Sequence, residues 1–263
     1  MPISSPLMTI LLKSPEEIEI LREGGRRHAE ILRTLAEMVE PGLPTLILEE
    51  EALRLIKEGG DKPATLGYTP AGARRPFPAA LCISINDEIV HGIPNEEPKI
   101  LRQGDIVSID LSLIHKTLFT DAAITVPVGA IDDESRELLK VTKRALEAGI
   151  AAAMPGNRIG DIGFAISDVV KGTRFSLAEN LVGHGLGYKL HEEPYVPNEG
   201  ERGKGEKLVP GTVIAIEPMV NAGKGGIKAM RDGYTIKTRD GSRSAHFEHT
   251  IAITEKGNIV LTK

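Results

Sequence analysis

The chain of 263 residues contains no tryptophan, and aromatic residues make up only 3% of it, although 41% of its residues are hydrophobic. A core of adequate size must therefore be built from leucine, isoleucine, valine and alanine. The single cysteine, Cys82, excludes an intramolecular disulfide and favours a reducing compartment. The net charge is −5 and no block of lysine and arginine stands out, which argues against nucleic acid or an anionic membrane surface as the main partner.

Targeting and membrane signals are also missing from the sequence. Residues 1–13 lack the basic stretch and apolar run of a secretory signal. No apolar run elsewhere approaches the roughly 20 residues that span a bilayer. We therefore expect a cytoplasmic protein that does not insert into a membrane.

Capping residues and apolar spacing divide the chain into two successive sets of helices and strands. Ser14 can cap a helix whose first turn accepts Pro15 and whose capping box is completed by Glu17, and Pro41-Gly42 stops that helix. Periodicity predicts the other elements. These are a helix over about 46–58, strands over 80–85, 105–113 and 122–128, a helix-rich stretch over 132–170, and strands over 212–216, 234–238 and 246–254.

The repeated order of elements suggests an internal duplication. The apolar residues Leu48, Ala52, Leu55 and Ile56 recur 114 positions later as Ile162, Ile166, Val169 and Val170. At a spacing of 107, the run Leu101–Asp110 lies over Leu208–Glu217, each with a turn glycine, an apolar strand and a final carboxylate. A third match sets Asp121 opposite Glu248. Chance similarity between two αβ segments is the alternative explanation.

We expect one domain over residues 1–263, with a short extension at about 1–13 and two α+β halves at about 14–130 and 131–263. A pseudo-twofold axis between the halves would bring four carboxylates together, namely Asp110, Asp121, Glu217 and Glu248. Four clustered acids repel one another unless positive charge lies among them, and the acid-bearing strands hold no lysine or arginine. Divalent metal ions are the simplest source of that charge.

The histidines narrow the chemistry. His184 lies in the glycine-rich run Val182–Gly187, and such glycines let a backbone approach a bound group closely. The run matches neither the dinucleotide fingerprint nor the P-loop pattern. His28 and His115 are expected at the surface. One imidazole with four carboxylates is an oxygen-rich ligand set that suits Mn, Fe(II) or Co, with Zn as a further candidate. Two such metals activate a bridging water to hydroxide and polarise a carbonyl group.

Taken in order and spacing, these motifs resemble the type I methionine aminopeptidases of the short bacterial kind over nearly the whole chain. The matching runs are Cys82–Asn86, His91–Pro94, Gly104–Asp110, Thr120–Ala122, Gly183–Gly187, His191–Pro194, Ile216–Val220 and Phe247–Thr250. The resemblance implies a pita-bread fold, of class α/β (α+β), in which a curved antiparallel sheet has helices outside it. It also implies a metal-dependent aminopeptidase that removes the N-terminal methionine of nascent proteins and prefers small second residues.

The resemblance further assigns roles to individual residues. Two metals would be bound by Asp110, Asp121, His184, Glu217 and Glu248, with Asp121 and Glu248 bridging. His91 would contact the scissile amide, His191 would bind the carbonyl oxygen, and Glu217 would also shuttle a proton to the leaving amine. The job on nascent chains implies ribosome association, and we expect a monomer.

The methionine pocket matches the family less closely. Cys82 fits the pocket cysteine, and Tyr68 and Phe77 fit the pocket aromatics. His91, His191 and Tyr234 complete the expected substrate-binding set. However, the loop Thr69–Pro76 is longer than in compact members, Leu190 replaces a frequent aromatic, and Tyr234 replaces a common tryptophan. Two alternatives share the fold: a proline-directed peptidase, which usually has an additional N-terminal domain, and a non-catalytic binding protein, which loses metal ligands.

Overall fold

The capping box predicted at the start of the first helix is present. The structure is a computed structural model that describes residues 10–263. Helix α1 (Pro15–Glu37) begins with the Ser14 hydroxyl accepting the amide hydrogen of Glu17, while the Glu17 carboxylate accepts that of Ser14. Helix α2 (Thr45–Glu58) follows and ends before Gly59. Residues 1–9 of the predicted N-terminal extension lie outside the described residues.

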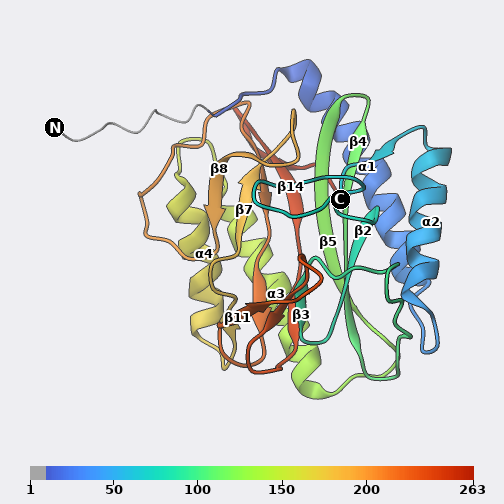
Figure 1. Ribbon diagram of the computed structural model, residues 1–263. Helices are drawn as coiled ribbons and strands as arrows, with labels where there is room; N and C mark the ends of the chain where they lie inside the picture. The colour runs from blue at the N-terminus through green and yellow to red at the C-terminus, as the bar shows by residue number, and fades with distance from the viewer. Residues whose placement is uncertain (1–9) are drawn as a thin grey trace.

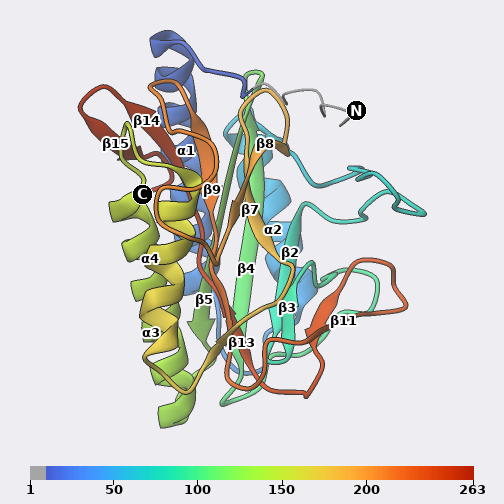
Figure 2. The same ribbon diagram turned by 90° about the vertical axis from the view of Figure 1, so that its left-hand side faces the viewer.

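A second helix pair occupies the middle of the chain. Helix α3 (Asp133–Ala152) is capped by Asp132, whose carboxylate accepts the amide hydrogen of Ser135. Helix α4 (Ile159–Lys171) packs against α3, and Figure 2 shows the two helices side by side along one flank of the strands. In Figure 1, α2 lies on the opposite side of the strands from α4, so the helix pairs lie on the outside of the molecule.

The strands form two larger sheets, both antiparallel. The first contains β1 (Lys62–Pro63), β4 (Ile106–His115) and β2 (Leu81–Ile85) in that order, with β5 (Leu118–Pro127) also paired to β4. The second has the order β15 (Gly257–Val260), β14 (His249–Thr254), β9 (Val213–Ile216), β7 (Val182–Gly185) and β8 (Glu192–Pro197). Two small sheets complete the fold: β13 (Ser244–His246) with β10 (Met219–Asn221) and β6 (Ser176–Leu177), and β11 (Ile227–Ala229) with β12 (Ile236–Thr238) and β3 (Glu88–Val90).

The two larger sheets meet where β5 runs antiparallel to the junction of β13 and β14. Ala123 and Glu248 form a backbone bridge at the centre of this seam. On one side of the bridge, the Thr125 hydroxyl donates to the carbonyl oxygen of His246 and accepts its amide hydrogen. On the other side, the Thr250 hydroxyl does the same for Asp121. Threonine hydroxyls therefore take the place of backbone groups in joining the sheets.

The core is aliphatic, as the composition predicts. One cluster lies between α1, α2 and the first sheet, and includes Leu35, Leu48 and Ile109. A second lies between α3, α4 and the second sheet, and includes Leu138 and Ile216. Both clusters leave the opposite faces of the sheets free to carry polar side chains. No helix within residues 10–263 is long and apolar enough to cross a membrane.

Two predicted features are wrong. His28 and His115 were expected at the surface, but both side chains are buried. The His28 side chain lies between α1 and β5, with its Nδ1 atom 3.1 Å from the Thr120 hydroxyl. Nδ1 of His115 lies at hydrogen-bond distance, 2.7 Å, from Oδ1 of Asp61. In addition, the strand predicted over 246–254 is interrupted between β13 and β14, at Phe247 and Glu248. The division into halves at about residue 130 stays a prediction.

The seam generates a stability prediction. Replacing Thr125 by valine keeps its shape but leaves the amide and carbonyl groups of His246 without their partner, so the free energy of unfolding should fall by about 1–3 kcal/mol. Urea unfolding in the presence of chelator, followed by circular dichroism, measures the change. Thr34→Val is the matched control, because the Thr34 hydroxyl makes only an exposed hydrogen bond within α1. Equal losses in the two variants would contradict this account of the seam.

Candidate metal centre

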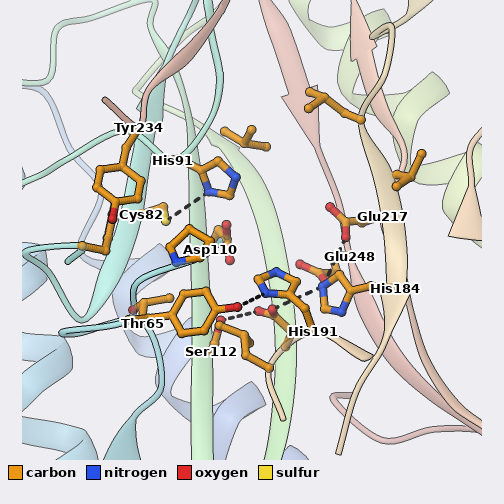
Figure 3. Close-up of a pocket in the computed structure, with 18 of the residues that line it drawn as sticks. Thr65, Cys82, His91, Asp110, Ser112, His184, His191, Glu217, Tyr234 and Glu248 are labelled. Atoms are coloured by element: carbon orange, nitrogen blue, oxygen red, sulfur yellow. Dashed lines mark hydrogen bonds and ion pairs between the residues drawn. The ribbon is translucent and has the colours of Figure 1, made fainter. Parts of the chain in front are cut away.

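The four predicted carboxylates and His184 all line one cavity of about 660 Å³. Asp110 and Asp121 come from the β4–β5 hairpin of the first sheet. Glu217 directly follows β9, and Glu248 directly precedes β14. Figure 3 shows Asp110 on one side of the cavity and Glu217, Glu248 and His184 on the other. The two sheets therefore each supply two carboxylates.

The orientation of His184 points one ring nitrogen, Nε2, at the acids. Its Nδ1 atom lies 3.0 Å from the carbonyl oxygen of Gly185, which can only accept, so Nδ1 carries the proton. Nε2 then faces Glu217 at 3.5 Å and Asp121 at 3.9 Å. A hydrogen bond that fixes the tautomer while the other nitrogen stays free is the usual arrangement of a metal-binding histidine.

Burial and mutual repulsion raise the pKa of three of the carboxylates, whereas in Glu217 the effect of burial is outweighed by the facing His246 and His184, which lower its pKa. Burial raises the pKa of Asp110 to about 6. Burial, followed by the charge of neighbouring carboxylates, raises the pKa of both Asp121 and Glu248 well above the usual range. A bound cation reverses this effect, because it stabilises the ionised forms.

Several buried polar atoms at the cavity wall lack hydrogen-bond partners among the described residues. They are one carboxylate oxygen of Glu248, Oε1, and both ring nitrogens of His246. Such atoms are costly to bury unless something satisfies them. Two groups of three side chains bring their ligand atoms within 4.8 Å of one another: Asp121, His184 and Glu248, and Glu217, His246 and Glu248. Glu248 belongs to both groups, so the donor set fits a pair of cations that share one carboxylate.

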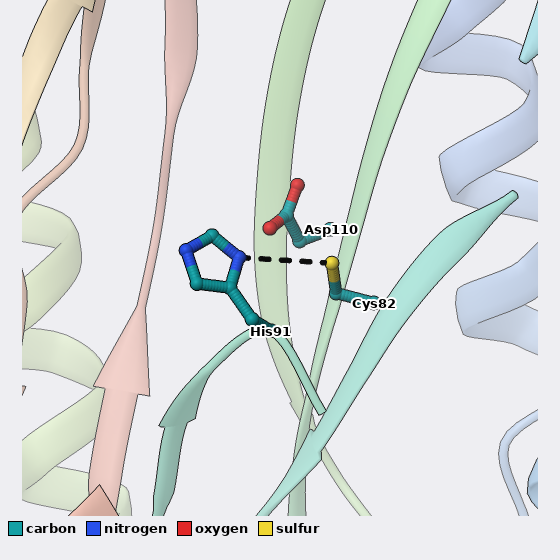
Figure 4. A group of neighbouring side chains, drawn as sticks. All are labelled: Cys82, His91 and Asp110. Atoms are coloured by element: carbon teal, nitrogen blue, oxygen red, sulfur yellow. Dashed lines mark hydrogen bonds between the residues drawn. The ribbon is translucent and has the colours of Figure 1, made fainter. Parts of the chain in front are cut away.

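Cys82, His91 and Asp110 form a third group beside the other two. Figure 4 shows the three side chains pointing toward one another, with the Cys82 sulfur 4.0 Å from His91 Nδ1. Burial raises the pKa of the Cys82 thiol well above its usual range, so the sulfur is protonated at neutral pH. His91 has a left-handed backbone, with φ of 59°, and precedes Gly92, whose missing side chain lets this turn lie against the backbone of Ile83.

His191 stands across the cavity from His91. Its Nδ1 atom lies 2.8 Å from the Tyr68 hydroxyl, and its ring centroid lies 4.4 Å from that of His184. Burial, and then the nearby His184, lowers the pKa of His191 to about 4. The ring is therefore neutral at pH 7, with one nitrogen able to donate and the other able to accept.

An apolar pocket adjoins these histidines. Phe77 and Tyr234 meet edge to face with centroids 5.0 Å apart, and they pack with Cys82 and Ile93. Every predicted pocket residue lines the cavity, including Tyr68 and Leu190. The long loop Thr69–Pro76 is fastened to this wall, because the Tyr234 hydroxyl donates to the carbonyl oxygen of Arg75.

The sequence did not indicate four polar residues of the cavity, and the glycines beside His184 were misinterpreted. The missed residues are Thr65, Ser112, Tyr195 and His246. Ser112 donates to Asp121 at 2.9 Å. Two-residue alternation on the strands could have found Ser112 from Asp110, and His246 from Glu248. Side chains at Gly183, Gly185 and Gly187 would collide with Ala215, Glu193 and Lys13 respectively. These glycines therefore leave room for other parts of the chain, and not for the predicted bound group.

Comparison with known proteins identifies the protein family to which the chain is similar. The model of metallopeptidase family M24 matches residues 19–255. A methionine aminopeptidase of Aquifex aeolicus is 46% identical over 97% of this chain and all of its own length, and methionine aminopeptidase 1 of Bacillus subtilis is 43% identical over 97% and 99%. The crystal structure of methionine aminopeptidase from Thermotoga maritima superposes with a TM-score of 0.92 at 41% identity, covering 97% of this chain and 100% of that one.

A more distant likeness concerns the fold alone. Prolidase from Pyrococcus furiosus superposes with a TM-score of 0.72 at 22% identity, and the match covers 96% of this chain but 65% of that chain. These comparisons confirm the predicted pita-bread fold and the resemblance to methionine aminopeptidases. A metallopeptidase binds divalent metal, and the clustered carboxylates and histidines are the candidates for holding it here. The chain belongs to metallopeptidase family M24.

Proposed function

We propose that this protein is a methionine aminopeptidase that removes the N-terminal methionine of nascent polypeptides and prefers small second residues. The observation that carries the proposal is the direct opening of one apolar pocket onto the carboxylate cluster, within a single cavity. Methionine is unbranched and apolar, which suits the wall of Phe77, Cys82, Ile93 and Tyr234. The relatives that are 46% and 43% identical over nearly the whole chain carry the same name.

The proposed metal ligands are the five residues predicted from the sequence: Asp110, Asp121, His184, Glu217 and Glu248. They would hold two divalent ions, with Glu248 and Asp121 between them. The oxygen-rich set favours Mn, Fe(II) or Co, with Zn as a further candidate. When bound, the metals would activate water and polarise the scissile carbonyl group.

Three side chains would handle the substrate around that centre. If Tyr68 donates its hydroxyl hydrogen to Nδ1 of His191, the Nε2 hydrogen of His191 is left to donate to the substrate carbonyl oxygen as negative charge develops there. His91, on its fixed turn, would contact the scissile amide. Glu217 lies 3.5 Å from His184 and 3.6 Å from His246, and would pass a proton to the leaving amine.

The finer partner and compartment predictions rest on the same proposal. We infer that the protein acts in the cytoplasm as a monomer, on nascent chains near the ribosome. The family's work on nascent chains supports the inferred compartment and the nearness to the ribosome.

A peptide assay tests the function. Chelated protein reconstituted with Mn, Co, Fe(II) or Zn should release methionine from Met-Ala-Ser, and should leave Lys-Ala-Ser and Ala-Pro intact. Cleavage of Ala-Pro would favour the proline-directed alternative. Absence of turnover with every metal, despite two ions bound per chain, would favour the non-catalytic alternative.

His191→Ala tests the carbonyl-binding role. Loss of a preorganised donor to a developing oxyanion should lower kcat by roughly 10²–10³-fold and leave the metal content intact. Steady-state kinetics and metal analysis measure the two effects. Lys189→Ala is the control, because that exposed side chain lies two residues away, outside the cavity. Near wild-type turnover in His191→Ala would refute the role.

Glu217→Ala tests the shared role of this carboxylate. Removing it should weaken metal binding and abolish activity together, because the side chain belongs to a candidate ligand group and would also carry the proton. Titration calorimetry and elemental analysis report the affinity and the metal content. Glu199→Ala removes an exposed carboxylate outside the cavity and should change neither property. Unchanged metal stoichiometry with full activity in Glu217→Ala would contradict the assignment.

A further inference from the structure

The turn that carries His191 is built around the next residue, Glu192. One carboxylate oxygen of Glu192 accepts the amide hydrogens of Tyr188 at 2.6 Å and Lys189 at 2.7 Å. The other oxygen forms a 2.6 Å ion pair with the ammonium group of Lys13. Glu192 therefore closes the turn on itself and ties it to a residue far away in the sequence.

Lys13 belongs to the short segment that precedes α1. In Figure 1 this segment, in dark blue, crosses near the upper ends of β7 and β8 before the helix begins. The backbone amide of Lys13 donates a hydrogen bond to the carbonyl oxygen of Gly211, in the turn before β9. Tyr188 adds a second tie, because its hydroxyl donates to Glu17 at 2.7 Å. The start of the described chain thus serves as a brace for the His191 turn.

The ammonium group of Lys13 is enclosed and makes two hydrogen bonds. Its side chain is 1% exposed and that of Glu192 is 3% exposed. The ammonium group also donates to the carbonyl oxygen of Leu11 at 2.8 Å and lies 4.8 Å from the centroid of the Tyr188 ring. A buried carboxylate that loses its cation is strongly destabilised, so Glu192 depends on Lys13 to stay in place.

The turn before His191 lacks a side chain at the position where Lys13 packs against it. Gly187 adopts φ of 132°, and a side chain there would collide with the Lys13 side chain. The carbonyl oxygen of Gly187 accepts the amide hydrogen of Phe119 at 2.8 Å, two residues before Asp121. The same turn is thereby connected to the brace on one side and to the hairpin that carries Asp110 and Asp121 on the other.

We propose that Lys13 is a positioning residue for His191, acting through Glu192; this inference rests on the proposed function, in which His191 binds the substrate carbonyl oxygen. Tyr68 fixes the ring of His191 from the cavity side, whereas the Lys13–Glu192 pair fixes its backbone from the opposite side. Catalytic geometry is sensitive to displacements of about 1 Å, which can cost about 10²-fold in rate. Lys13 itself does not line the cavity.

Lys13→Met tests the proposal, since methionine keeps an unbranched apolar side chain, one atom shorter than that of lysine, and removes the charge. We expect kcat for Met-Ala-Ser to fall by roughly 10–100-fold with KM and metal stoichiometry unchanged. Amide hydrogen exchange in the turn Leu186–Leu190 should become faster. Glu192→Gln combined with Lys13→Met should recover part of the lost kcat, because glutamine keeps the two backbone hydrogen bonds without an unpaired charge. The double variant also serves if Lys13→Met alone does not fold.

Two further comparisons separate positioning from general destabilisation. Leu35→Ala empties part of the core cluster between α1, α2 and the first sheet, far from the turn. It should lower the free energy of unfolding, but kcat should stay unchanged at temperatures below the unfolding transition. Lys13→Met added to His191→Ala should cause no further loss of kcat, because the residue through which it acts is gone. Three results would each overturn the proposal. Lys13→Met could lower kcat as much in the His191→Ala background as in the wild type, Leu35→Ala could lower kcat as much as Lys13→Met does, or hydrogen exchange in the turn could stay unchanged. Failure of the proposed function would instead appear as absent turnover in the wild-type protein, and the hydrogen-exchange comparison would still decide whether Lys13 holds the turn.

Discussion

Four carboxylates crowded into one cavity, of which Asp121 and Glu248 are buried, impose the constraint on which the rest of the structure depends. Burial and neighbouring negative charge raise the pKa of Asp121 and Glu248 together, and a bound cation would favour their ionised forms. The fold keeps them close by fixing each backbone from outside the cavity. Helices pack behind both sheets, and the seam at Ala123 and Glu248 prevents the sheets from moving apart.

This constraint explains why the strands place aliphatic side chains on one face and acidic side chains on the other. Aliphatic residues such as Ile109 and Ile216, which precede Asp110 and Glu217, anchor the strands on their helix-facing side. The alternation along a strand then points the acid the other way. The same principle places Ser112 beside Asp121. The carboxylate-bearing part of the cavity wall is polar because it consists of strand faces that the helices leave uncovered, whereas the pocket around Phe77 and Tyr234 is apolar.

Much of this arrangement could be predicted from the sequence, because the signals are local or repeated. The capping box at Ser14, the buried strand ending near Asp110 and the matching run before Glu217 each follow from residue spacing. The placement of Asp110, Asp121, His184, Glu217 and Glu248 on one cavity was predictable from the repeated strand-and-acid pattern and from the family resemblance.

Features that depend on long-range packing were not predictable. His28 lies in a charged helical segment, yet it is buried because that face of α1 packs near Thr120, 92 residues away. His115 is buried because it meets Asp61. The glycines at 183, 185 and 187 read locally as room for a ligand, but the space is taken by other parts of the chain. Short strands such as β3 and β10 have too few residues to show a period.

The seam also determines at what stage of chain synthesis the carboxylate cluster can assemble. The candidate ligand carboxylates come from both sheets, and Glu248, which the seam sets beside Ala123, follows the other three in the sequence. A growing chain that has not yet reached Glu248 lacks the group shared by both candidate metal sites. Synthesis of most of the polypeptide and assembly of this carboxylate cluster are therefore separated in time.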